Sequence, residues 1–126
     1  MNIKIRSKDF DIIPPIDEYV NKKISSLEKF LDEQELAICE VEIGKSTKHH
    51  RSGEIFRAEV NILEPGNKQV YAVAEKIDIY AAIDTVRDEA ERAIVSRKTK
   101  RETLFRRGRT RVKNLLKRIN FKRKWK

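Results

Sequence analysis

Residues 56–62 read Phe56-Arg57-Ala58-Glu59-Val60-Asn61-Ile62, so that apolar and polar side chains alternate at every step. A period of two is typical of a strand with one buried face, and it predicts a strand at about 54–63. The same alternation predicts strands at about 2–7, 36–44 and 69–76. Between the strands predicted at 54–63 and 69–76, Glu-Pro-Gly-Asn-Lys at 64–68 has the residue types of a hairpin loop.

Two other segments repeat their apolar residues at steps of three and four, which is typical of amphipathic helices. Pro14-Pro15 opens the first, because proline is tolerated at the first helical position, and the apolar stripe predicts a helix to about residue 31. Asp78 is a good N-cap for the second, which we expect to run to residue 98 at least and to extend as far as 106. After Gly108, a short basic amphipathic segment is expected to become helical only on a partner.

The predicted order of elements is therefore β-α-β-β-β-α, followed by a tail. Each strand has one apolar face and each helix has one apolar stripe, so the simplest burial places both helices on one face of a four-stranded sheet. The predicted fold class is α+β, a two-layer sandwich, and the periodicity leaves the strand order open. We expect the other sheet face to be polar, with Lys4, Arg6, Glu40, Glu42, Arg57 and Glu59.

The charge is distributed very unevenly along the 126 residues, which carry +9 overall. Residues 1–96 hold 14 Lys and Arg against 19 Asp and Glu (14 − 19 = −5), whereas residues 97–126 hold 15 against one (15 − 1 = +14). Such a basic end favours a polyanionic partner. Nucleic acid is the first candidate and an anionic membrane surface the second, although basic residues spread all round the tail suit RNA better than a membrane.

The residue patterns of enzymes and metal sites are not found. The four glycines fit no phosphate-binding loop, the adjacent His49-His50 are expected to be exposed loop residues, and Cys39 is expected in the core. The sequence thus predicts no enzyme, no cofactor, no metal and no small-molecule substrate. One cysteine, an opening strand in place of a signal peptide, and no apolar run of about 20 residues predict a cytoplasmic protein without a membrane span.

The second predicted helix opens with Asp78-Ile79-Tyr80-Ala81-Ala82-Ile83-Asp84. This run resembles the D-x-Y-A-A-I-D signature of the ribosome hibernation promoting factor / ribosome-associated inhibitor A family, whose members were formerly named sigma-54 modulation proteins. The first helix agrees, because Glu18-Tyr19-Val20, Lys23 and Leu27-Glu28-Lys29-Phe30 resemble the family's E-[FY]-V-x-x-K-x-x-x-L-E-x-[YF] pattern. The resemblance covers about residues 1–101.

The resemblance implies a fold similar to a double-stranded RNA-binding domain. It also implies a ribosome hibernation factor that binds the small ribosomal subunit and its ribosomal RNA at the decoding region, blocks messenger RNA and transfer RNA, and inhibits translation in stationary phase or stress. Long members carry a further C-terminal domain that pairs two ribosomes, so we expect a short form that is monomeric when free. We divide it into a ribosome-binding domain, 1–101, and a basic C-terminal tail, 102–126, that is helical when bound.

Lys23 matches the family's first-helix lysine, and Arg92 matches a basic position of the second helix, although Glu89 and Ser96 stand where other members are often basic. We interpret Asp78, Tyr80 and Asp84 as structural. The basic residues expected to contact RNA, by motif or by spacing, are Lys22, Lys23, Lys29, Arg87, Arg92, Arg97, Lys98, Lys100, Arg101, Arg106, Arg107, Arg109 and Arg111.

The tail is interpreted as an RNA anchor, in which Phe105, Phe121 and Trp125 are aromatic residues suited to stacking on unpaired bases. The alternative function is a general RNA-binding or ribosome-structural module held permanently by this tail. A transcription modulator, which the older family name suggests, is disfavoured because the sequence shows no DNA-reading helix.

Overall fold

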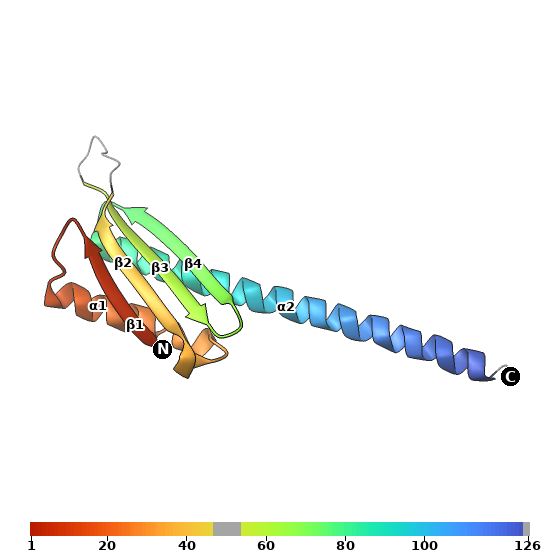
Figure 1. The fold of residues 1–126 in the computed structure, drawn as a ribbon. Helices are drawn as coiled ribbons and strands as arrows, with labels where there is room; N and C mark the ends of the chain where they lie inside the picture. Colours follow the sequence, from red (N-terminus) through yellow and green to blue (C-terminus); the bar gives the residue numbers. More distant parts are fainter. Residues whose placement is uncertain (47–53, 125–126) are drawn as a thin grey trace. The chain divides into compact units, whose positions relative to one another are not determined.

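The computed structural model describes residues 1–46 and 54–124 (Figure 1). Within these ranges, the side chains are described as far as residue 109 and at residue 111. The predictions for His49, His50, Phe121 and Trp125 fall outside this description. The elements follow the predicted order and are β1 (Asn2–Lys8), α1 (Pro14–Ser25), 3-10 turns at Glu28–Phe30 and Gln34–Leu36, β2 (Ile38–Lys45), β3 (Phe56–Glu64), β4 (Lys68–Lys76) and α2 (Ile79–Lys124). The chain forms two compact units, residues 1–94 and 95–126.

The four strands form one sheet in the order β1-β2-β3-β4. β1 and β2 are parallel, and their connection contains α1, as a parallel pair requires a crossover. The other neighbours are antiparallel, and the register places Val41 opposite both Ile5 and Val60. The apolar positions of all four strands therefore fall on one face of the sheet. At the β3–β4 turn, Gly66 and Asn67 adopt positive φ angles of 84° and 59°, which glycine and asparagine tolerate.

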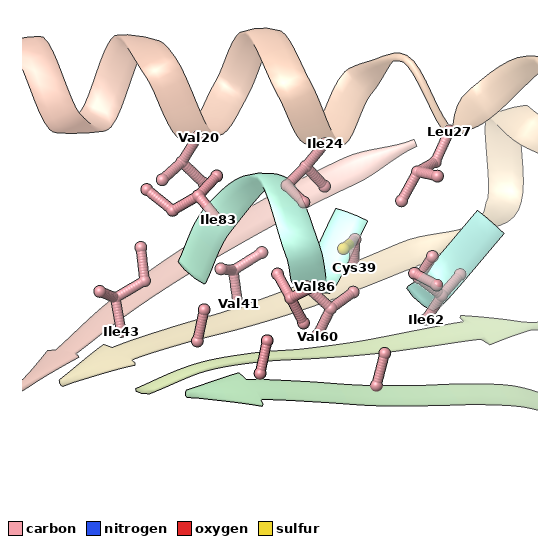
Figure 2. Close-up of a cluster of buried hydrophobic side chains, with 14 of the residues drawn as sticks. Val20, Ile24, Leu27, Cys39, Val41, Ile43, Val60, Ile62, Ile83 and Val86 are labelled. Atoms are coloured by element: carbon pink, nitrogen blue, oxygen red, sulfur yellow. The ribbon is translucent and has the colours of Figure 1, made fainter. Parts of the chain in front are cut away.

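The core lies between this face, α1 and the first turns of α2, as Figure 2 shows. Val20 and Ile24 from α1 and Ile83 from α2 are fully or almost fully buried above the sheet. Cys39 is buried and free, as predicted, and burial raises the pKa of its thiol to about 12. The predicted two-layer α+β fold is confirmed.

α1 ends earlier than predicted, at Ser25 instead of about residue 31. The hydroxyls of Ser25 and Ser26 donate to the carbonyl oxygens of Lys22 and Lys23 at 3.2 and 2.5 Å, and such side-chain bonds compete with the helical ladder. The apolar stripe nevertheless continues, because Leu27 remains buried beyond the end of the helix.

α2 reaches residue 98 as predicted, but it continues past 106 and through Gly108 to Lys124, farther than the sequence indicated. One glycine costs only about 1 kcal/mol in a helix, and its arginine, lysine and leucine neighbours are good helix formers. The predicted N-cap is confirmed, since Asp78 Oδ1 accepts a hydrogen bond from the backbone amide of Tyr80 at 3.2 Å. No helix within the described ranges combines the length and apolar character needed to cross a membrane.

The sheet face away from the helices is polar, as predicted. Arg57 lies 3.1 Å from a Glu59 oxygen and 3.8 Å from Glu75, and the Tyr71 hydroxyl donates to Glu59. That hydrogen bond is the main cause of the lowered pKa of Glu59. Cations and carboxylates are therefore paired on this face, which makes it a poor surface for a polyanion.

Candidate nucleic-acid interface

Motif residues join the two helices within the first unit. The hydroxyl of Tyr19, on α1, donates to Asp84 Oδ1, on α2, at 2.6 Å. The ring of Tyr19 also meets the ring of Tyr80 edge to face, with centroids 4.9 Å apart and planes at 83°. Tyr80 and Asp84 thus have the structural role that we interpreted from the sequence, although they act by holding α1 against α2.

Lys23 is positioned by the same residues. Its Nζ lies 3.7 Å from Asp84 Oδ1 and 5.5 Å from the centroid of the Tyr19 ring. The lysine that matches the family pattern is thus oriented by an aspartate of the second motif. Its side chain remains more than a third exposed, and exposed ion pairs contribute little stability, so a phosphate can compete with Asp84 for the ammonium group.

Lys22, Lys23 and Arg87 come together along a shallow groove between α1 and α2. The residues that line it are Lys22, Lys23, Ser26, Asp84, Arg87 and Asp88. Lys22 is exposed, and in the part of the chain that the structure describes it has no carboxylate partner. Sequence reasoning missed Ser26 and Asp88, because neither residue belongs to a recognisable pattern.

Arg87 is more buried, and makes more contacts within the protein, than the sequence indicated. Its side chain is only 16% exposed, its Nε donates to Ser26 Oγ at 2.9 Å, and its Nη1 lies 3.2 Å from an oxygen of Glu91. The guanidinium also lies 6.0 Å from the centroid of the Phe30 ring, which Lys29 approaches to 5.2 Å. Arg87 therefore braces α2 against the end of α1, and its contact with RNA stays a prediction.

Arg92 follows Arg87 by five residues on α2 and has its own carboxylate partner. Its Nη1 is 2.6 Å from Glu89 Oε1, so the glutamate that departs from the family pattern offsets this cation. With 14 basic and 19 acidic residues among residues 1–94, the first unit has a net charge of 14 − 19 = −5. The groove, with three cations and two carboxylates, thus has a small positive charge (3 − 2 = +1) on an acidic unit.

The second unit holds the other predicted RNA-binding residues, all on the continuation of α2. The exposed ones are Lys100, Arg101, Arg106, Arg107, Arg109 and Arg111, whereas Arg97 and Lys98 are partly buried. Residues 95–126 contain 15 basic residues and one acidic residue, a net charge of 15 − 1 = +14. This unit therefore dominates the electrostatic attraction of the chain for a polyanion.

The contact between Tyr19 and Asp84 predicts a pH dependence. The hydrogen bond to Asp84, aided by burial, raises the pKa of Tyr19 to about 12 from an ordinary value of 10.0. Because the pKa of Tyr19 is higher in the folded state, the protonated hydroxyl stabilises the fold. This contribution is complete below pH 10 and is lost as the pH rises towards 12. We expect Asp84→Asn to lower the Tyr19 pKa.

Phenolate absorbance measures this change, with Tyr19→Phe in each background identifying the Tyr19 signal. Unfolding at several alkaline pH values measures the matching loss of stability. An unchanged Tyr19 pKa in Asp84→Asn would contradict the contact.

The chain matches known proteins over most of its length. Residues 3–102 match the family described as Sigma 54 modulation protein / S30EA ribosomal protein. The chain is 27% identical to a ribosome hibernation promoting factor of Pseudomonas putida over 105 residues, covering 83% of this chain and 94% of that protein. It is 29% identical to one of Klebsiella oxytoca over 100 residues, covering 79% and 96%.

Solved structures agree with this match. The Protein Y N-terminal domain of Thermus thermophilus superposes with a TM-score of 0.61 at 31% identity, covering 75% of this chain and 96% of that one. A ribosomal subunit interface protein from Coxiella burnetii superposes with a TM-score of 0.63 at 20% identity, covering 79% and 99%, and supports the fold alone.

Proposed function

Because the chain belongs to the Sigma 54 modulation protein / S30EA ribosomal protein family, we propose that it is a ribosome hibernation factor. In this proposal, it binds the small ribosomal subunit at the decoding region as a cytoplasmic monomer. It then blocks messenger RNA and transfer RNA and inhibits translation in stationary phase or stress. The observation that carries the proposal is the family match over residues 3–102, which includes both motifs, together with curated relatives named ribosome hibernation promoting factors.

The groove between α1 and α2 supports RNA binding through phosphates. Lys22 and Lys23 come from α1 and face Arg87 of α2, and groups fixed on two packed helices suit recognition of a rigid phosphate backbone. Recognition of this kind depends on the shape of the RNA and not on base sequence. The rest of the first unit is acidic, which disfavours RNA binding elsewhere on its surface.

The second unit supports a separate role as an RNA anchor. Its charge of +14 contrasts with −5 for the first unit, so the long-range attraction to ribosomal RNA would come mainly from residues 95–126. The first unit would then supply the fit to the decoding region. The boundary between the two units, at residues 94 and 95, is close to the domain boundary predicted between residues 101 and 102. That each part has its own role stays a prediction.

Co-sedimentation with separated ribosomal subunits tests the proposal. We expect the full chain to sediment with the small subunit and to be displaced by messenger RNA together with transfer RNA, because the sites would overlap. We expect Lys22→Gln to weaken this binding severalfold, since one phosphate contact is lost, whereas Lys4→Gln on the opposite sheet face has no such effect. Binding that ignores messenger and transfer RNA would contradict the decoding-region site.

The charge of the second unit also favours the alternative function, a ribosome-structural module anchored by residues 95–126. Ribosome occupancy separates the two functions. A hibernation factor leaves the ribosomes when growth resumes, whereas a structural protein stays on them. Quantifying the protein in ribosome fractions before and after regrowth therefore decides between the two.

A further inference from the structure

An exposed aromatic ring lies on the basic helix of the second unit. The Phe105 side chain is 66% exposed, and the Arg109 guanidinium, one turn later, lies 5.2 Å from the centroid of its ring. This distance is within the range of a cation–π interaction. Neither residue is needed for the core of the first unit, so packing within residues 1–94 does not account for the pair.

The geometry leaves part of the ring accessible. A guanidinium stacked on an aromatic ring covers one face, and the high exposure of Phe105 means that its remaining surface meets solvent. Exposed arginines lie one turn before it, at Arg101, and directly after it, at Arg106. A flat apolar group is thus flanked by cations that can reach the phosphates on either side of a base.

We propose that Phe105 and Arg109 form a stacking platform for an unpaired RNA base. This inference rests on the proposed function and deepens it by naming a single-stranded segment of RNA as the ligand of the second unit. Charge complementarity selects a polyanion, because residues 95–126 hold 15 basic residues and only Glu102 as an acid. The aromatic ring selects an unpaired base, because the bases of an A-form duplex are stacked on each other and offer no free face.

The test uses the full chain with two fluorescent RNAs, a short oligoadenylate and a duplex that has the same number of phosphates. We expect Phe105→Ala to lower the affinity for oligoadenylate by about 5- to 100-fold, the range found when one stacking residue is removed. The affinity for the duplex should stay within about twofold, since the phosphate contacts remain.

Two further variants separate stacking from general apolar contact. Leu104 is also 66% exposed and is the neighbouring residue, so Leu104→Ala removes a similar apolar surface without an aromatic ring, and we expect no change with either RNA. Phe105→Leu keeps the apolar surface and should behave like Phe105→Ala. Circular dichroism of each variant checks that the helix is retained.

The outcomes distinguish this inference from the function on which it rests. If the unaltered chain binds neither RNA, the proposed RNA anchor is wrong. If it binds both, and Phe105→Ala binds oligoadenylate as well as the unaltered chain does, only the stacking platform is overturned. Equal losses for Phe105→Ala and Leu104→Ala, or equal losses with oligoadenylate and duplex, would also overturn the platform.

Discussion

Removing residues 102–126 is expected to lower the affinity for ribosomes by about 100-fold or more at low salt and to flatten its salt dependence. The deletion removes 11 of the 29 basic residues and one of the 20 acidic residues. The remaining chain therefore holds 18 basic and 19 acidic residues, a net charge of −1 in place of +9. Because residues 1–101 have no net positive charge, their binding to RNA would depend only on the local cations and the shape of the first unit.

The measurement is the slope of log affinity against log salt concentration. Each phosphate contact contributes about 0.7–0.9 to this slope, because each contact releases condensed counterions. Several lost contacts therefore lower the slope by several units, whereas loss of a purely apolar contact leaves the slope unchanged. Parallel lines for the full and shortened chains would show that residues 102–126 make no phosphate contacts.

A full-length variant controls for the shortened chain. Replacing Arg106, Arg107, Arg109 and Arg111 by glutamine keeps the chain length and lowers the net charge from +9 to +5. Glutamine and arginine have similar helix propensities, so α2 should persist. We expect an affinity and a salt slope between those of the full and the shortened chains. Residues 1–94 contain the hydrophobic core that the structure describes, so the shortened chain should keep the unfolding transition of the first unit.

The strands were predictable because each one has a buried and an exposed face, and their observed ends differ from the predicted ones by two residues at most. The ends of the helices were less predictable. Apolar spacing does not report the hydroxyl of Ser26 bonding back to Lys23, nor whether Gly108 ends a helix or is included in it. These outcomes depend on local competition for backbone hydrogen bonds, which a pattern of apolar residues does not contain.

The site was predictable as a set of residue types but not as a set of contacts. Lys23 and Asp84 were both recognisable from motifs, yet they are 61 residues apart, and only the packing of α1 on α2 makes them a pair. The same packing brings the Arg87 guanidinium within hydrogen-bonding distance of Ser26, a contact that the sequence did not indicate. By contrast, the pairing of Arg92 with Glu89 follows directly from helical spacing.

Replacing Ile83 by alanine is expected to produce a large loss of stability, about 2–5 kcal/mol in the free energy of unfolding. Ile83 belongs to the motif that opens α2, is 1% exposed, and lies in the buried cluster with Val20 and Val41 (Figure 2). Truncating it removes apolar contacts and leaves a cavity where two helices meet one sheet, so little of the loss can be recovered by local collapse.

Urea unfolding of the full chain measures this loss, with Val73→Ala as the control. Val73 lies on the polar sheet face and is 40% exposed, so its truncation should cost less than about 1 kcal/mol. If the motif isoleucine serves the fold alone, Ile83→Ala should bind ribosomes with unchanged affinity wherever it remains folded. A stability loss no greater than that of Val73→Ala would contradict the buried position of Ile83. Weaker ribosome binding by the folded variant would instead show that the start of α2 contributes to the interface.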